Sequence, residues 1–221
     1  MQKNSIDTKK LVSVSLLTAM AYMLVFIFHI VPMPTLLGFL SYDPKDIILI
    51  FIGLLYGPLS GLASTIVVCL IEMVTVSDTG PIGLIMNFIS SSAMVLIPAY
   101  IFKTKRVFSR LVIGLVAGTL VMTALMLLWN YLITPLYMGY PREAVKDMLL
   151  PLFLPFNLTK GAINCVLVAL IYKPLSSVLV KARLMPKAET QSERKSDFIF
   201  GIILGAVFII ITAVYYFIVK F

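Results

Sequence analysis

The sequence predicts an all-α integral membrane protein, with a core of six helices followed by a seventh, C-terminal transmembrane helix. Hydrophobic residues make up 60% of the 221-residue chain and charged residues 13%, whereas soluble domains are about 45–50% apolar and about 25% charged. The mean hydropathy is +1.03. A chain this apolar has too little polar surface to cover itself in water, and the same composition excludes disorder, a collagen-like chain and a disulfide scaffold.

Five apolar runs are long enough to cross a bilayer as helices, which takes about 20 residues. They cover residues 11–31, 82–102, 111–135, 152–172 and 198–219. The stretch 46–75 is also apolar, but it contains Gly57-Pro58, a pair that ends helices. It could therefore form one helix or two.

The basic residues decide between one helix and two, because Lys and Arg concentrate on the cytoplasmic side of membrane proteins. They form three clusters: Lys3, Lys9 and Lys10; Lys103, Lys105, Arg106 and Arg110; and Lys173, Lys181, Arg183, Lys187, Arg194 and Lys195. Two helices, about 46–57 and 59–75, place all three clusters, 13 of 18 basic residues, on one side. We therefore predict two helices, a cytoplasmic turn between them and a cytoplasmic N-terminus. The first helix is roughly 18 Å long, shorter than a hydrocarbon core of about 30 Å, so it is either extended by its flanking loop or shielded from lipid.

This topology divides the chain into four parts. They are a cytoplasmic N-terminus (1–10), a six-helix substrate-binding membrane domain (11–182), a cytoplasmic linker (183–197) and an extra C-terminal transmembrane helix (198–221). Residues 32–45, 76–81 and 136–151 face outside. A formal net charge of +8 would suggest nucleic acid in a soluble protein, but here it marks orientation, and we expect a lipid bilayer and no nucleic acid as partner.

Polar residues gather at one depth, toward the outer ends of several predicted helices. They are Glu72, Thr75, Asn87, Asn130, Asn157, Lys160 and Asn164, together with Tyr42, Asp43 and Asp46 from the first outer segment. Each has an ordinary explanation, such as a hydrogen bond between helices or a lysine reaching the headgroups. Polar groups inside a bilayer are nevertheless costly and mark functional sites. The joint pattern, with aromatic residues nearby, favours a pocket for a flat, partly apolar ligand.

Motifs for energy conversion and metal catalysis are absent from the sequence. No G-x-x-x-x-G-K-[ST] loop for ATP is present, and neither H-E-x-x-H nor a Cys/His cluster accompanies the single histidine, His29. The two cysteines lie inside apolar runs and are expected to pack there without a disulfide. These observations favour a binding subunit without enzymatic activity or a cofactor, driven by another protein.

Residues 9–182 resemble the substrate-binding (S) components of energy-coupling-factor (ECF) vitamin transporters, above all the riboflavin-specific ones. The resemblance rests on Phe39–Pro44, Gly57–Gly61, Gly83–Phe88, Trp129–Tyr131 and Leu154–Gly161. The last two segments are the most specific, since their Asn and Asn-x-x-Lys positions match flavin-binding residues of the family.

The resemblance implies a subunit of a bacterial plasma membrane that binds riboflavin, its transported ligand, from outside. Asn130, Asn157 and Lys160 would meet the polar edge of the flavin, with Asn87 as a helper, and Leu40, Tyr42 and Met86 would lie against its apolar end. The family docks on a transmembrane coupling protein, driven by two ATPase subunits, through A-x-x-x-A on the first helix. Here the nearest match is Ser15-x-x-x-Ala19; serine is small enough for a close approach.

Three other functions remain open from the sequence alone. The protein could be an S component for another heterocyclic vitamin, because a fold does not fix its ligand. It could be a membrane-embedded enzyme that uses Glu72 or Lys160, although metal ligands and a nucleophile–base pair are lacking. It could also be an assembly subunit without a ligand.

Overall fold

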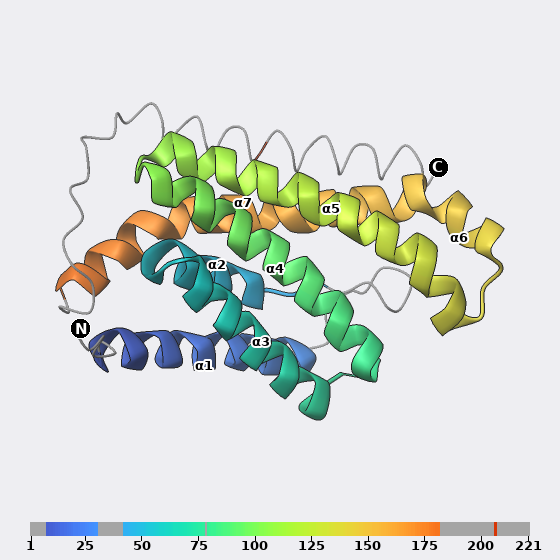
Figure 1. Ribbon diagram of the computed structural model, residues 1–221, viewed down its shortest axis with the longest axis horizontal. Coiled ribbons are helices and arrows are strands. Elements are labelled where there is room, and N and C mark those ends of the chain that lie inside the picture. Colours follow the sequence, from blue (N-terminus) through green and yellow to red (C-terminus); the bar gives the residue numbers. More distant parts are fainter. Residues whose placement is uncertain (1–7, 31–41, 78, 182–205, 207–221) are drawn as a thin grey trace, which may run out of the picture.

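The computed structural model describes residues 8–30, 42–77, 79–181 and 206, and in this part of the chain the secondary structure is entirely helical (Figure 1). The helices are α1 (Thr8–Ile30), α2 (Lys45–Tyr56), α3 (Pro58–Thr75), α4 (Gly80–Thr104), α5 (Phe108–Met138), α6 (Arg142–Met148), the π-helical stretch η1 (Leu149–Phe153) and α7 (Leu154–Lys181). The predicted all-α fold is thus confirmed for the six-helix core. The predicted linker 183–197 and the seventh helix 198–219 lie outside the described residues, apart from residue 206.

The stretch 46–75 forms two helices, as the distribution of basic residues predicts. Gly57 separates them with a φ of 100°, a backbone conformation that glycine adopts without steric cost. Pro58 follows as the first residue of α3, where its missing N–H leaves no helical hydrogen bond unmade.

Helix α2 lies in the interior of the bundle, in contact with α1, α3, α4 and α7. Its residues Leu49, Ile50 and Ile52 are fully buried. With 12 residues it is roughly 18 Å long, too short to cross a bilayer alone. Of the two ways expected for a short helix to fit, the structure therefore shows shielding from lipid by its neighbours.

The other helices are long and apolar enough to cross a membrane: α1, α3, α4, α5 and the continuous run Arg142–Tyr172. The boundaries expected at residues 135 and 152 are wrong. Helix α5 continues to Met138, and after a turn at Gly139, with a φ of 68°, the chain is helical again from Arg142. Much of the predicted outer segment 136–151 is therefore helix, because the polar residues around Asp147 form a short amphipathic helix of their own.

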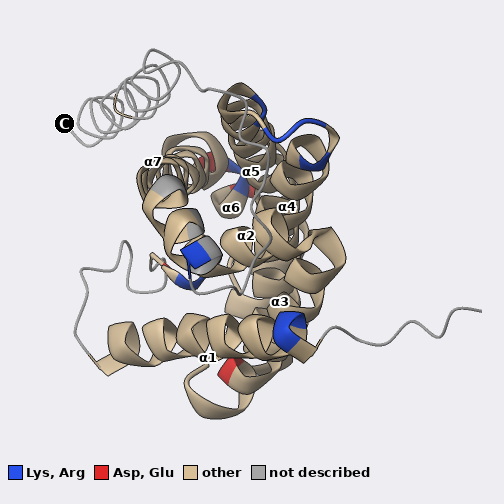
Figure 2. Ribbon diagram, turned by 90° about the vertical axis from the view of Figure 1, so that its left-hand side faces the viewer, with Lys and Arg blue, Asp and Glu red and all other residues tan. Residues whose placement is uncertain are grey.

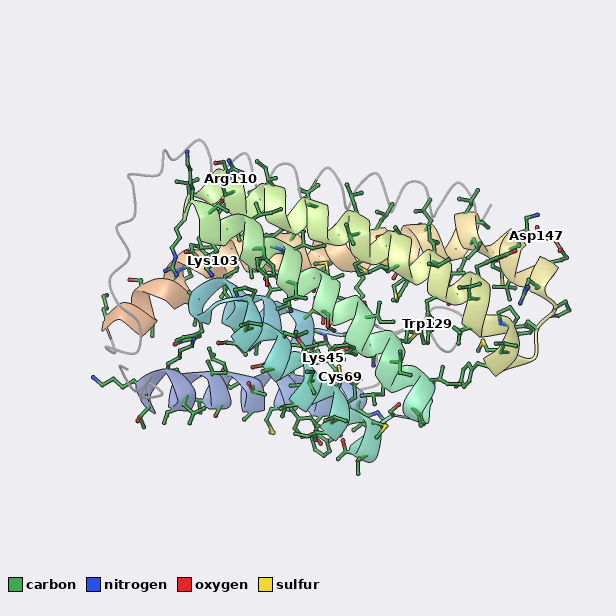
Figure 3. The ribbon with its side chains drawn as sticks, viewed as in Figure 1. Lys45, Cys69, Lys103, Arg110, Trp129 and Asp147 are labelled. Carbon is green, nitrogen blue, oxygen red and sulfur yellow. The ribbon has the colours of Figure 1, made fainter. Side chains whose placement is uncertain are left out.

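Basic residues mark one end of the long axis of the bundle. Lys103 and Arg110 lie at the end where α1 begins, and Asp147 lies at the opposite end (Figure 3). Viewed from the basic end, Lys and Arg appear at the start of α1 and around the connection between α4 and α5 (Figure 2). The arrangement agrees with the predicted separation of charge, while the cytoplasmic location of this end stays a prediction.

Glycines let neighbouring helices approach closely at two points of the bundle. A Cβ atom on Gly61 of α3 would lie 2.5 Å from Val95 Cγ1 of α4. A Cβ atom on Gly161 of α7 would lie 2.3 Å from Thr119 Cγ2 of α5. Neither contact is possible for a real Cβ atom, so small residues fix the spacing of these helices. Gly161 follows Lys160 directly, and its close contact sets the distance of that lysine from α5.

Candidate functional site

Three side chains before and at the start of α2, those of Tyr42, Lys45 and Asp46, connect this part of the chain to α3, α4 and α7. We call residues 42–46, Tyr-Asp-Pro-Lys-Asp, the polar segment. Lys45 is fully buried and lies near the middle of the bundle, between the end that carries Lys103 and the end that carries Asp147 (Figure 3). The polar segment therefore brings charge into the interior of the helix bundle, beside its apolar core.

The Lys45 ammonium joins the polar segment to α3 and α4. Its Nζ forms ion pairs with Asp43 and with Glu72, the latter at 2.7 Å. The second carboxylate oxygen of Glu72 accepts a hydrogen bond from Asn87 Nδ2 at 3.0 Å. Burial alone would raise the pKa of Asp43, but the nearby ammonium groups of Lys45 and Lys160 outweigh this effect and lower it.

Asp46 joins α2 to α4 and α7. One of its carboxylate oxygens accepts a hydrogen bond from Ser91 Oγ. The other, Oδ2, lies 3.4 Å from Lys160 Nζ but has no hydrogen-bond partner in the described residues. The two side chains thus form an ion pair without a hydrogen bond.

Tyr42 joins the polar segment to α7 at a second point. Its hydroxyl donates a hydrogen bond to Asn164 Oδ1 at 2.7 Å. Burial, followed by the nearby carboxylates of Asp46 and Asp43, raises the pKa of the Tyr42 hydroxyl above its usual value, so it remains a donor. Asn164 is fully buried, and its Nδ2 has no partner among the described residues.

The first half of α7 presents further donors and acceptors that make no hydrogen bond within the described part of the chain. Lys160 is 8% exposed, and its ammonium makes no hydrogen bond within the described part of the chain. Asn157 Nδ2 donates to Phe153 O at 2.8 Å, while its Oδ1 is without a partner there. Because these residues are three apart, they share one face of the helix.

Asn130 is buried on α5, which packs against α7. Its Nδ2 donates to Met126 O at 2.7 Å, and its Oδ1 accepts from Thr134 Oγ1 at 2.9 Å. A carboxamide nitrogen carries two hydrogens, so one donor of Asn130 remains available. Of the residues expected at the apolar end, Met86 is half-buried against the core, and Leu40 lies outside the described residues.

No group of three or more His, Cys, Asp or Glu in the described ranges has the arrangement of a metal site. The three carboxylates of this region, Asp43, Asp46 and Glu72, instead face the ammonium groups of Lys45 and Lys160. With polar donors, acceptors and balanced charges but no reactive group activated by a base, the arrangement can bind a polar molecule and hold it in a defined orientation.

A family model of the substrate-specific component of ECF transporters matches residues 9–172. The chain belongs to this family, the ECF S components. An S component is part of a transporter and is not an enzyme, which confirms both the resemblance seen in the sequence and the absence of enzymatic activity expected there. Its helices make it a multi-pass membrane protein.

This S component is similar along most of its length to curated riboflavin transporters. It is 32% identical over 184 residues to riboflavin transporter FmnP of Bacillus subtilis, covering 79% of this chain and 96% of the relative. It is 30% identical over 182 residues to riboflavin transporter RibU of Staphylococcus aureus, covering 80% and 95%. A solved S component of a bacterial ECF transporter superimposes with a TM-score of 0.66 at 29% identity, covering 79% of this chain and 99% of that one.

The docking residues expected on the first helix of the S component are exposed. Ser15 and Ala19 both lie on the solvent- or lipid-facing side of α1. The same side carries large apolar residues that the bundle leaves uncovered: Val12, Leu16, Met23 and Ile27. This face is therefore available for contact with another protein.

Lys45 is a residue of this site that the sequence does not predict. It was expected to lie in an outer segment among the few basic residues outside the membrane, whereas the structure buries it completely. A signal was present, since Lys45 stands between two acidic residues directly before an apolar run. A charge in that position can be paired and buried, but the partner Glu72 is 27 residues away and no local pattern identifies it.

Proposed function

We propose that this S component binds riboflavin in the half of the bundle that contains Asn157 and Lys160 and delivers it to an ECF coupling module for ATP-driven uptake. The relatives' function as riboflavin transporters supports the ligand. The observation that carries the proposal is a pair of groups on one face of α7: the Lys160 ammonium, which is ion-paired with Asp46 but makes no hydrogen bond in the described residues, and the Asn157 carbonyl oxygen, which has no partner there.

The chemistry of these groups matches one edge of a flavin. The pyrimidine ring of the flavin presents two carbonyl acceptors on either side of an N–H donor. Lys160 offers only donors, whereas a carboxamide such as Asn157 or Asn130 offers a donor and an acceptor. Lys160 and Asn130 would donate to the carbonyl oxygens, and Asn157 Oδ1 would accept from the ring N–H. Tyr42, Met86 and Leu40 would cover the less polar part of the ring, and Asn87 would assist through its oxygen.

Isothermal titration of riboflavin into detergent-purified variants tests this assignment. Removing one partner of a buried hydrogen bond costs about 1–3 kcal/mol, and more when the donor is charged. We therefore expect Asn157→Ala and Lys160→Ala each to weaken binding by roughly tenfold to a few hundredfold. Lys103→Ala, at an exposed lysine at the basic end of α4, is the matched control and should bind normally. Unchanged affinity in both site variants would refute the assignment.

We further propose that the exposed side of α1 around Ser15 and Ala19 docks on the transmembrane coupling protein, which is driven by two ATPase subunits. Small side chains there allow the close helix contact that membrane association needs. Ala19→Trp should abolish uptake in cells that contain the coupling module while leaving riboflavin affinity unchanged. Ala124→Trp, at an exposed alanine on α5, is the control. An equal loss of binding in Ala19→Trp would show that Ala19 supports the fold and is not a docking contact.

A further inference from the structure

Asp46 and Lys160 form a buried ion pair that is not accompanied by a hydrogen bond. Asp46 is fully buried, and only one of its carboxylate oxygens receives a hydrogen bond, from Ser91. The second oxygen faces Lys160 at 3.4 Å without a hydrogen bond. A buried carboxylate oxygen without a hydrogen bond is costly. The ion pair thus fixes the position of the Lys160 ammonium, while the N–H groups of this ammonium remain available to another acceptor.

A lysine near the end of a membrane-spanning helix has a flexible side chain that can extend toward the lipid headgroups. In this structure the Lys160 side chain is instead buried, with its ammonium beside Asp46 of α2. Ser91 of α4 holds the carboxylate by its other oxygen, which leaves Oδ2 directed at the lysine. Side chains of α2, α4 and α7 therefore determine together where the Lys160 ammonium lies.

We propose that Asp46 is a positioning residue for the flavin, which orients the Lys160 ammonium toward the ring edge and does not contact the ligand itself. This inference rests on the proposed function, because it concerns the same site. Lys45 also lies near Asp46, but its ammonium is paired with Asp43 and Glu72. Substitution of Asp46 therefore removes the ion-pair partner of Lys160 and leaves those two ion pairs intact.

If Asp46 acts on flavin binding only through Lys160, two results are expected that a general structural role of Asp46 would not give. The effect of Asp46→Asn should disappear once Lys160 has been replaced, because no ammonium is left to orient. It should also be the same for riboflavin and for lumiflavin, which has the same ring edge but a methyl group in place of the hydroxylated chain. A direct contact of Asp46 with that chain would affect riboflavin alone.

The experiment is a double-mutant cycle with flavin fluorescence quenching as the measure of binding. The proteins are the unsubstituted chain, Asp46→Asn, Lys160→Met and the double variant, each titrated with riboflavin and with lumiflavin in detergent. We expect Asp46→Asn to weaken both flavins by roughly fivefold to fiftyfold. In the Lys160→Met background the same change should alter affinity by less than about twofold, which is the signature of coupled residues.

Asp147→Asn, at an exposed acid of α6, is the control and should have no effect. If Asp46→Asn does not fold, Ser91→Ala, which keeps every charge but frees the carboxylate, takes its place with an expected loss of about twofold to fivefold and the same dependence on Lys160. Equal losses with and without Lys160, a loss for riboflavin but not lumiflavin, or no loss would each overturn the positioning role. Failure of the unsubstituted protein to bind either flavin would refute the proposed function itself, and the positioning role with it.

Discussion

Replacement of Lys45 by methionine should destabilise the protein more than any substitution of an exposed charge. The ammonium is fully buried and is the ion-pair partner of both Asp43 and Glu72. Methionine fills a similar volume but carries no charge, so two carboxylates of the bundle interior would lose their cation. Breaking a buried ion pair by removing one partner costs about 3–5 kcal/mol, because the remaining charge is left without compensation.

This cost corresponds to a large shift in thermal unfolding. For a chain of 150–250 residues, each kcal/mol lowers the unfolding midpoint by roughly 2–4 °C. The expected fall for Lys45→Met is therefore about 6–20 °C, measured by circular dichroism of the detergent-purified protein. Lys103→Met, at an exposed lysine, should change the midpoint by no more than about 2 °C, since an exposed charge contributes little.

A second variant separates lost charge from lost packing. Adding Glu72→Gln to Lys45→Met removes one of the two uncompensated carboxylates, and its amide can still accept the hydrogen bond from Asn87. The double variant should regain part of the lost stability. If Lys45→Met unfolds within about 2 °C of Lys103→Met, or if Glu72→Gln lowers stability further in the Lys45→Met background, the buried network does not hold these helices together.

Two further predictions concern packing and topology. Gly161→Ala places a Cβ atom 2.3 Å from the Thr119 methyl group and should cost about 1–3 kcal/mol of stability by overpacking. The unfolding midpoint should fall, and Thr119→Ser, which removes that methyl group, should partly restore it. An unchanged midpoint in Gly161→Ala would contradict the close contact. Lys105→Cys should resist an impermeant thiol reagent on intact cells and Arg142→Cys should react, because basic clusters stay inside; the opposite labelling would reverse the orientation.

The fold was largely predictable from the sequence because membrane helices leave strong local signals. The apolar runs locate them, and the Gly57-Pro58 pair with the distribution of Lys and Arg separates α2 from α3. The ends of helices were less predictable. Arg142 begins a helix outside the apolar run because polar residues form amphipathic helices equally well.

The candidate site was predictable residue by residue but not as a set of contacts. The spacing of Asn157 and Lys160 puts them on one helix face, and the structure shows both with unused groups. The sequence indicated neither the burial of Lys45 nor the pairing of Asp46 with Lys160, because these contacts join residues from separate helices. The sequence likewise did not indicate that Asn164 accepts a hydrogen bond from the Tyr42 hydroxyl.

The most direct test of riboflavin binding is whether the purified protein retains the flavin. The chain should be expressed alone, purified in detergent, incubated with riboflavin, freed of excess ligand by gel filtration and measured by absorbance. We predict about one riboflavin per chain, with the flavin fluorescence changed from that of the free ligand because the ring is bound inside the protein. A folded protein that leaves the column colourless, with all flavin eluting at the position of free ligand, would contradict the proposed function.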